Sequence, residues 1–468
     1  MSSSPLVLRA GELAAAVHGQ LASGRPDVLV AGLSIDSRRV SPGDLFVAIR
    51  GERFDGHAFV ADAVKKGASG VIVSDTSVTS ASEVPSFVIV VDDTTRALQY
   101  MARHVRRLSG ARVVAITGSI GKTTTKEISA TLLASKYRVF RNHGNLNNHI
   151  GLPLSLFALR DRPEIAVVEL GMNHAGEIRV LVETAEPDTC VWTNVTEVHS
   201  AFFESLDTIA DAKAEILEIA TAKTDLIANA ADPRIMTRIS QFPGSVTTFG
   251  IDVAADVSAS NVRGFGLDGM EATVRTPDDT GSLRTPLLGR GNVANILAAI
   301  AVALRFQIPL EAMLSAIATL QPQARRGEVL RLGNVTVVDD SYNSNPTSLS
   351  QALETVGWET RYRRRVAVLG EMLELGLGSN ARHTACGRAA SKAGFELVVT
   401  VGGPAAIALA EGAIAAGLST SAVITCRSSE EAAAVVLKHV QAGDLVLVKG
   451  SRGIRMEVVV DRLKADLA

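Results

Sequence analysis

The sequence feature that most constrains the fold is a glycine-containing loop between a strand and a helix. Arg112–Thr117 is a short apolar, β-branched run typical of a buried strand, and Lys122–Leu133 has a helical pattern. The residues between them are Gly-Ser-Ile-Gly at 118–121. Successive backbone N–H groups in such a loop, together with the positive end of the following helix, bind phosphate groups. The segment therefore predicts an α/β domain that binds a nucleoside triphosphate.

Each residue type in this loop has its own task in phosphate binding. Gly118 and Gly121 let the backbone approach a phosphate, Lys122 can reach the β- and γ-phosphates, and the Thr123 hydroxyl can bind Mg²⁺. The predicted nucleotide-binding residues of the loop are Gly118, Ser119, Ile120, Gly121, Lys122, Thr123 and Thr124. Ile116 occupies the place of the first glycine in the general G-x-x-x-x-G-K-[ST] pattern, so the motif is a shorter form. The alternative interpretation is a glycine-rich turn with an incidental lysine.

A second candidate is a carboxylate at the end of another buried strand. The segment Glu164–Gly171 is predicted to be a buried strand that ends in the carboxylate of Glu169. Because parallel strands end at the same edge of a sheet, this carboxylate is placed to bind Mg²⁺ beside the phosphate loop. The alternative is a solvated glutamate at a strand end.

Composition and charge exclude several classes of protein. The chain has 468 residues, 47% of them hydrophobic and 21% charged, with a formal net charge of -2, so we expect no nucleic-acid partner and no attraction to an anionic membrane. The cysteines Cys190, Cys386 and Cys426 form no CxxC pair, which argues against a zinc site or a disulfide framework. The apolar run Ile296–Leu304 is too short to span a bilayer, and the N-terminus lacks signal-peptide features. We therefore expect a cytoplasmic protein.

Alternating strand and helix patterns predict three α/β domains. We expect a smaller N-terminal α/β domain over residues 1–91 and a central ATP-binding domain over 92–321. The central domain is predicted to have a P-loop-type, mostly parallel sheet with helices on both faces, and Val257–Thr276 to form an antiparallel hairpin within it. A linker at 321–323 leads to a Rossmann-like C-terminal α/β domain over 322–468.

Further motifs make the chain resemble the Mur ligase family. In chain order they are Asp36-Ser-Arg38, Gly43-Asp44-Leu-Phe46, Phe54–His57, Thr123–Glu127, Asn145–Pro153, Glu169–Ile178, Thr193–His199, Ala212–Ile216, Asp339–Pro346, Gly370–Gly376 with His383, and Lys449–Arg452. The similarity spans nearly the whole chain. Two positions depart from the family pattern: Gly291 stands where a histidine is usual, and Arg325-Arg326-Gly327-Glu328 replaces a Gly-Arg before the glutamate.

The resemblance implies an ATP-dependent ligase of peptidoglycan synthesis. In this chemistry a peptide carboxylate attacks the γ-phosphate of ATP, and an amine then displaces phosphate from the acyl phosphate. Two unit charges about 4 Å apart repel by about 4 kcal/mol at an effective dielectric of 20, so cations must offset this repulsion. The expected substrates are UDP-N-acetylmuramoyl-tripeptide and D-alanyl-D-alanine. The alternative within the family adds the third, diamino-acid residue, but its Asp-Asn-Pro-Arg motif is absent.

The implied catalytic set is Lys122, Glu169, His199 and Lys213. The resemblance implies two Mg²⁺ ions, one held by Thr123 and Glu169 and one by His199 and Lys213. Because an ammonium cannot bind Mg²⁺, Lys213 would have to be a carbamylated lysine, and burial would favour the neutral amine that reacts with CO₂. From periodicity alone, Lys213 is a surface lysine of a helix over Thr208–Ala220, and His199 alone is a structural histidine.

The remaining candidate residues are implied by the same resemblance. Asn295 would contact adenine, Arg326 the γ-phosphate and Asp340 the ribose of ATP. The UDP-sugar end would contact Ser37, Arg38, Asp44, Asp55 and His57. Other substrate contacts would come from Asn148, Asn343, Asn345, Lys449 and Arg452. Helix caps, turns and surface ion pairs are the alternative roles, and we expect a monomer.

Two other functions compete with this interpretation. One is a non-catalytic P-loop regulator, which would bind ATP without forming a bond. The presence of Glu169, His199 and Lys213 together argues against it, because a protein that only binds ATP needs no second metal site. Folylpolyglutamate synthetase is a more distant alternative. The Asp-Ser-Arg and Gly-Asp-Leu-Phe segments of the N-terminal region argue against it.

Overall fold

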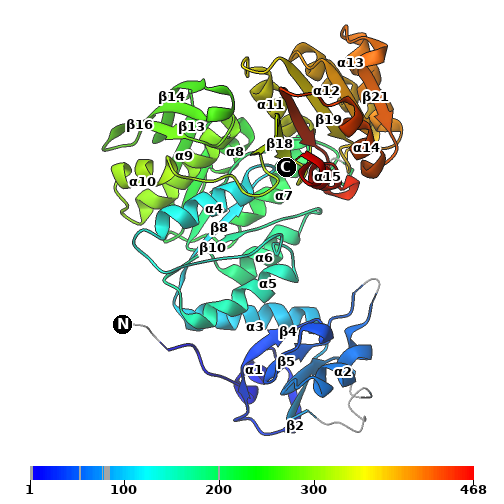
Figure 1. Cartoon of the computed structure of the whole chain (residues 1–468). Helices are drawn as coiled ribbons and strands as arrows, with labels where there is room; N and C mark the ends of the chain where they lie inside the picture. Colours follow the sequence, from blue (N-terminus) through cyan, green and yellow to red (C-terminus); the bar gives the residue numbers. More distant parts are fainter. Residues whose placement is uncertain (1–3, 52–53, 76, 78–84, 199–200, 468) are drawn as a thin grey trace.

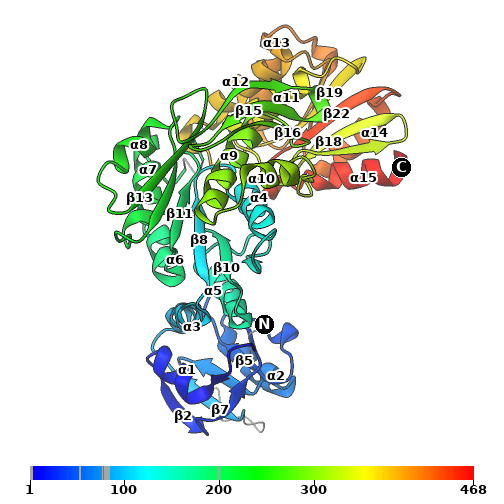
Figure 2. The same cartoon turned by 90° about the vertical axis from the view of Figure 1, so that its left-hand side faces the viewer.

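Three sheets, each covered by helices, follow one another along the chain (Figure 1). The computed structural model describes residues 4–51, 54–75, 77, 85–198 and 201–467. The N-terminal unit lies at one end of the molecule, and the central and C-terminal units lie together at the other (Figure 2). The predicted three-domain α/β architecture is confirmed. The boundaries at 91/92 and 321/322 stay predictions.

The N-terminal unit is built on a five-stranded sheet. Its strands, in spatial order, are β2 (Gln20–Gly24), β7 (Phe87–Val90), β6 (Gly70–Val73), β5 (Asp44–Val47) and β4 (Gly32–Ser34). Only β2 runs antiparallel to its neighbour. The helices are α1 (Ala10–Ala16) and α2 (Val60–Lys65), and a short pair is formed by β1 (Leu8–Arg9) and β3 (Leu29–Val30).

The central unit contains a nine-stranded sheet that is parallel over most of its width. Its strands, in spatial order, are β16 (Thr280–Thr285), β15 (Met270–Arg275), β14 (Val257–Gly264), β13 (Ser245–Ile251), β12 (Asp225–Asn229), β11 (Thr189–Trp192), β8 (Arg112–Thr117), β10 (Ile165–Glu169) and β9 (Val139–Arg141). The expected hairpin is the antiparallel pair β14–β15, and β16 extends it by one strand.

Successive residues of β8 face two different cores, as the alternation of a strand requires. Val113 and Ala115 pack into the core formed with α3 (Thr94–Ser109), α5 (Gly151–Leu156) and α6 (Glu177–Ala185). Val114 and Ile116 pack into the core formed with α4 (Lys122–Leu133), α9 (Arg290–Arg305) and α10 (Leu310–Ile317). The sheet is therefore covered on both faces, and α3 also lies between it and the N-terminal unit (Figure 1).

The C-terminal unit has a six-stranded sheet, parallel except for its edge strand β17. The strands, in spatial order, are β17 (Glu328–Leu332), β18 (Val335–Asp340), β22 (Asp444–Lys449), β19 (Arg364–Gly370), β20 (Leu397–Val401) and β21 (Val423–Cys426). Its helices are α11 (Pro346–Gly357), α12 (Ser379–Lys392), α13 (Pro404–Ala415), α14 (Ser429–His439) and α15 (Glu457–Leu467). No helix in the part of the chain that the structure describes is long and apolar enough to cross a bilayer.

One expected helix ends early. The helix predicted over Thr208–Ala220 is α7 (Leu206–Ala214), followed by a single 3₁₀ turn at Glu215–Leu217. The Glu215 carboxylate accepts hydrogen bonds from the backbone N–H groups of Gly176 and Arg179, at 2.6 and 3.0 Å. These contacts of Glu215 coincide with the change from α-helix to 3₁₀ turn. Helical periodicity in the sequence cannot reveal them.

A buried carboxylate joins the C-terminal unit to the β14–β15 hairpin. Glu359, 2% exposed, accepts a hydrogen bond from the Leu267 N–H (3.1 Å) and pairs with Arg361 at 2.6 Å. Arg361 also pairs with Asp268 at 2.6 Å. The hydrogen bonds from Arg361, and then that from Leu267, lower the pKa of Glu359 to about 2 despite its burial. Glu359 is therefore an ionised bridge between two units.

We expect Glu359→Gln to lower the free energy of unfolding by about 1–2 kcal/mol at pH 7, because hydrogen bonds to a charged group are lost. A carboxylate with a lowered folded-state pKa stabilises above its unfolded pKa, near 4.5, and this contribution is lost as the pH falls to about 2. Urea unfolding at several pH values should show the difference from wild type narrowing over that range. The exposed Glu411→Gln is the control, and a pH-independent difference would contradict the account.

Candidate active site

A cleft of about 800 Å³ lies between the central and C-terminal units. Its lining includes the phosphate loop, the segment after β10 and the start of α9 on one side, and the segment after β18 on the other. Of the predicted site residues, the lining contains Ser119, Ile120, Gly121, Lys122, Thr123, Thr124, Asn148, Glu169, Asn295, Arg326, Asp340, Asn343, Asn345, Lys449 and Arg452. Residues from two domains therefore converge on one cavity.

The two glycines of the loop have conformations and neighbours that exclude a side chain. Gly118 and Gly121 have φ values of 145° and 84°, in a region that L-residues avoid. A Cβ atom on Gly118 would overlap the Thr193 hydroxyl, and one on Gly121 would overlap the Asn295 amide oxygen. Replacing either glycine by alanine would therefore push the loop away from the neighbours that fix its shape.

A polypeptide segment after β11 fixes the loop from the side. We call residues 193–197 the strap. The Asn194 side chain accepts a hydrogen bond from the Ile120 N–H (2.9 Å) and donates one to its carbonyl (3.0 Å). The Asn194 carbonyl accepts the Ser119 N–H, and the Thr196 N–H donates to the Ser119 hydroxyl. The loop is therefore shaped before any phosphate binds.

The backbone N–H groups in the first turn of α4 lack helical acceptors, as at every helix start. This turn begins at Lys122 and continues through Thr123 and Thr124, which all line the cleft. The Lys122 ammonium donates to the carbonyls of Gly118 (2.7 Å) and Ser119 (3.3 Å). Burial lowers the pKa of Lys122, and the nearby Glu169 opposes that shift. The arrangement presents N–H groups and one lysine to an anion.

Glu169 has a buried oxygen that accepts no hydrogen bond from the described part of the chain, as a cation site requires. Its side chain is nearly fully buried, and its Oε1 accepts a hydrogen bond from the Asn147 amide. Its Oε2 is buried and accepts no hydrogen bond from the described part of the chain. Lys126 is 4.0 Å from this oxygen. Because buried carboxylate oxygens normally have partners, Oε2 together with the Thr123 hydroxyl fits an oxygen-ligated ion such as Mg²⁺.

Three residues behind Glu169 were missed by sequence reasoning. Lys126 is fully buried, with its ammonium 2.5 Å from the Asn142 carbonyl and 3.2 Å from Glu127. The Asn142 side chain accepts the Glu169 N–H at 3.2 Å, and Asn147 holds the carboxylate itself. Lys126 follows Lys122 by four residues, so both lie on one face of the helix. This spacing could have identified Lys126 as a site residue from the sequence.

Lys213 lies in the interior and not on the surface. It is 2% exposed on α7, and burial together with the positive charge of Lys122 lowers its pKa well below the ordinary value. A surface lysine at this position could pair with Asp207, but Asp207 pairs with Arg238. His199 lies outside the described residues. Within the described ranges, no group of three or more His, Cys, Asp or Glu side chains is arranged to hold a metal.

The C-terminal unit supplies several predicted residues to the cleft, and one of them contacts the phosphate loop. Arg326 donates to the Thr123 hydroxyl at 3.2 Å. The Lys449 ammonium contacts the Asp340 carboxylate at 2.6 Å and the Asn343 carbonyl at 3.0 Å. The first contact places a guanidinium group of the C-terminal unit against the loop, and the other two tie Asp340 and Asn343 to Lys449 within that unit.

Tyr342 organises the two arginines of this side of the cleft. The guanidinium carbon of Arg326 lies 3.9 Å from the ring centroid, and that of Arg452 lies 5.1 Å from it. Such cation–π contacts orient guanidinium groups without neutralising them. Tyr342 stood inside a recognised motif but was not predicted as a site residue.

Three predicted asparagines have local structural hydrogen bonds as well as positions in the cleft. The Asn148 side chain accepts the Gly151 N–H (2.7 Å) at the start of α5, and that of Asn345 accepts the Ser348 N–H (2.9 Å) at the start of α11. Asn295 donates to the side chain of Asn292 at 3.2 Å. Turn and cap chemistry therefore accounts for the side-chain bonds of Asn148 and Asn345.

The five predicted residues of the N-terminal unit do not line this cleft. They are Ser37, Arg38, Asp44, Asp55 and His57. The His57 ring accepts the Ser74 N–H (2.8 Å) through Nε2, so its Nδ1–H donates to Asp55 at 2.6 Å. Hydrogen bonds from the backbone and ring of His57 lower the pKa of Asp55 to about 2. Arg38 pairs with Asp36 at 2.9 Å. Asp44 accepts the Ser41 N–H at 2.8 Å.

Both departures from the family pattern have structural explanations. A Cβ on Gly291 would lie 3.0 Å from the side-chain oxygen of Gln351 on α11, so glycine leaves room for the C-terminal unit. Arg325 has a φ of 65° and pairs with Asp461 of α15 at 3.4 Å. Arg326 is therefore the arginine of this pair that reaches the phosphate loop.

Comparisons with known proteins cover nearly the entire chain. Three family models match it: the Mur ligase family catalytic domain over residues 29–106, the Mur ligase middle domain over 116–303, and the Mur ligase glutamate ligase domain over 325–452. The chain is 35% identical over 453 residues to the UDP-N-acetylmuramoyl-tripeptide–D-alanyl-D-alanine ligase of Bacillus subtilis, covering 96% of this chain and 97% of that protein. The chain belongs to the Mur ligase family.

Solved structures of other Mur ligases have the same three-domain fold. MurF from Acinetobacter baumannii superposes with a TM-score of 0.89 at 29% identity, covering 99% of this chain and 100% of that one. MurF from Thermotoga maritima in complex with ADP gives a TM-score of 0.82 at 28% identity, covering 93% and 97%. The family resemblance seen in the sequence of this Mur ligase is confirmed.

We expect Lys213→Met to raise the free energy of unfolding of this Mur ligase by about 1 kcal/mol or more at pH 7 in CO₂-free buffer. Because the folded-state pKa of Lys213 is lowered, the unfolded chain binds more protons between that pKa and about 10.5. The free-energy cost of burying Lys213 therefore shrinks as the pH rises. The difference in the free energy of unfolding between Lys213→Met and the wild type should shrink with it. Urea unfolding between pH 7 and 10 measures it, with exposed Lys223→Met as control. A constant advantage would contradict the burial argument.

Proposed function

We propose that this Mur ligase joins D-alanyl-D-alanine to UDP-N-acetylmuramoyl-tripeptide, converting ATP to ADP and phosphate. Relatives named for this activity match the chain from end to end, at 35% and 36% identity. The structure of one MurF relative holds ADP. The product is the UDP-muramoyl-pentapeptide precursor of peptidoglycan. The observation that carries the proposal is that one interdomain cleft holds both the phosphate loop and a buried Glu169 oxygen without a hydrogen-bond donor in the described part of the chain.

The cleft is suited to the electrostatic problem of this reaction. The terminal carboxylate of the tripeptide attacks the γ-phosphorus of ATP, ADP leaves, and the dipeptide amine then displaces phosphate from the acyl phosphate. At about 4 Å two unit charges repel by about 4 kcal/mol at an effective dielectric of 20. Lys122, Arg326 and Arg452 line the cleft and supply positive charge against this repulsion. These three charged side chains are already in the cleft before the reaction, so the protein needs little rearrangement to stabilise the charge that develops.

The proposed metal ligands follow from the chemistry of the donors. Thr123 and Glu169 would hold one Mg²⁺, and His199 and carbamylated Lys213 a second. Bound Mg²⁺ would neutralise charge between the phosphate oxygens. A lowered pKa leaves Lys213 the neutral amine that CO₂ requires: an N–C bond forms, a proton is released, and the product is an anionic carbamate. Support for the first site is the unpaired Glu169 Oε2.

The other predicted residues receive roles that match their positions. Asn295 would contact adenine and Asp340 the ribose, while Arg326 would approach the γ-phosphate. The incoming dipeptide and acyl phosphate would contact Asn148, Asn343, Asn345, Lys449 and Arg452. The UDP-sugar end would bind Ser37, Arg38, Asp44, Asp55 and His57 of the N-terminal unit. We propose that the enzyme is a monomer that acts in the cytoplasm.

His383 is better explained as a structural residue. It is fully buried on α12, its Nε2 accepts the Met372 N–H at 2.8 Å, and its Nδ1–H donates to the Ser379 carbonyl at 2.8 Å. Burial lowers the pKa of His383. A neutral ring with both nitrogens occupied holds the segment after β19 in place.

We expect phosphate release to require ATP, UDP-N-acetylmuramoyl-tripeptide and D-alanyl-D-alanine together. Lys122→Met and Glu169→Gln should each lower kcat about 10²–10³-fold, the size of effect seen when a preorganised charge or donor is removed. Exposed Lys223→Met is the matched control and should retain wild-type turnover. Product formation is followed by mass spectrometry of the nucleotide-linked peptide.

Three results would contradict the proposal. Full turnover by Lys122→Met or Glu169→Gln would show that the substituted residue takes no part in the reaction. Phosphate release without either peptide substrate would indicate a simple ATPase. Addition of a diamino acid to the UDP-linked dipeptide, with no reaction of D-alanyl-D-alanine, would identify the alternative member of the family.

A further inference from the structure

The strap is held from two sides. Toward the cleft it bonds to Ser119 and Ile120 of the phosphate loop. Two more side chains, one from the last residue of β12 and one from the segment after it, hold its backbone. The Asn229 amide donates to the Thr193 carbonyl at 2.8 Å, and the Asp232 carboxylate accepts the Val195 N–H at 2.7 Å. Displacement of the strap would therefore displace the loop.

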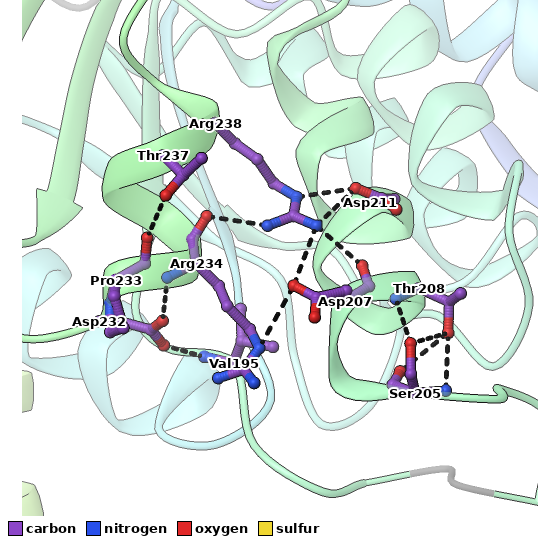
Figure 3. A network of polar contacts seen from close by, with 10 residues as sticks. All are labelled: Val195, Ser205, Asp207, Thr208, Asp211, Asp232, Pro233, Arg234, Thr237 and Arg238. Carbon is purple, nitrogen blue, oxygen red and sulfur yellow. Dashed lines mark hydrogen bonds and ion pairs between the residues drawn. The ribbon is translucent and has the colours of Figure 1, made fainter.

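Asp232 holds the strap with one oxygen and a helix with the other. Its Oδ2 accepts the Val195 N–H, and its Oδ1 accepts the Arg234 N–H at 3.1 Å, capping α8 (Pro233–Arg238) (Figure 3). The residue is only 8% exposed, and it is not part of the cleft lining. Because both oxygens accept a backbone N–H, the carboxylate links the start of α8 rigidly to the strap.

A network behind Asp232 fixes α8 against α7, the helix that carries Lys213. Arg238 pairs with Asp211 at 2.7 Å and donates to the Asp207 carbonyl at 3.1 Å. Arg234 lies 3.5 Å from the Asp207 carboxylate (Figure 3). These contacts join α8 to α7, and none of them touches Asp232's carboxylate or the strap.

We propose that Asp232 is a positioning residue for nucleotide binding, acting through the strap on the phosphate loop. The inference rests on the proposed function only in taking that loop as the ATP site. Asp232 would not touch the nucleotide. It holds Val195, so that Asn194 and Thr196 keep Ser119 and Ile120 in the shape that receives phosphate. A loop that is already ordered loses less conformational entropy on binding.

The test uses the full-length Asp232→Ser variant. Serine is a good N-cap, so it can still accept the Arg234 N–H and preserve α8, but its shorter side chain cannot also reach Val195. We expect the Kd for ADP, measured by calorimetry without Mg²⁺, to rise about tenfold. Amide hydrogen exchange in the nucleotide-free protein should become faster in the peptide that contains Ser119 and Ile120.

Two further variants make the result specific. Asp232→Asn keeps the size of the side chain but offers one acceptor oxygen for two N–H groups, so it should also weaken ADP binding. Asp211→Asn disrupts the ion pair with Arg238 in the same network without touching the strap. It should leave both the ADP affinity and the exchange of the loop unchanged.

The outcomes separate this inference from the proposed function. Unchanged ADP affinity and loop exchange in Asp232→Ser would overturn the positioning role, even if the wild-type enzyme ligates its substrates. Equal effects of Asp211→Asn and Asp232→Ser would overturn it as well, because they would indicate general loosening of α7 and α8. Weakened ADP binding together with faster loop exchange in the Asp232 variants alone would support it, whichever peptides the wild type joins.

Discussion

The repulsion between a substrate carboxylate and the triphosphate is the constraint on which the organisation of the cleft depends. Positive charge must be concentrated where anions meet, yet a protein with a formal net charge of -2 has no global field to provide it. The chain meets this need locally, with a helix start, Lys122 and two arginines that stack on Tyr342. These groups come from two domains, so the full field exists only where the domains meet.

Local sequence pattern was sufficient for the buried strands and insufficient for features set by tertiary contacts. The strand predicted over Arg112–Thr117 has those bounds in the structure, because a buried parallel strand is a short, continuous apolar run. The end of α7 was misplaced because Glu215 turns to the backbone of Gly176. No periodicity in the sequence encodes that partner.

In the site, too, some residues could be predicted from the local sequence and others could not, because tertiary contacts determine their roles. The phosphate loop, Glu169 and the motif residues of the C-terminal unit could be named from sequence because their order and spacing are distinctive. Which asparagine of the 145–148 segment would hold Glu169 could not, since neighbouring amides are chemically equivalent until the fold orients them. Asn147 has that contact, whereas the Asn148 side chain accepts the Gly151 N–H in the turn before α5. Asp232 was missed for a related reason: its partner Val195 contributes only a backbone N–H.

The contacts between the central and C-terminal units differ in strength, and this has a consequence for how the cleft opens. At the cleft, Arg382 pairs with Glu197, and both side chains are partly exposed, at 26% and 43%. Water and salt weaken such pairs, so they cost little to separate. Glu359 is buried and its charge is satisfied by Arg361 and Leu267, so breaking that bridge costs more. We therefore expect the buried Glu359–Leu267 contact to persist longer than the Arg382–Glu197 pair when the central and C-terminal units separate.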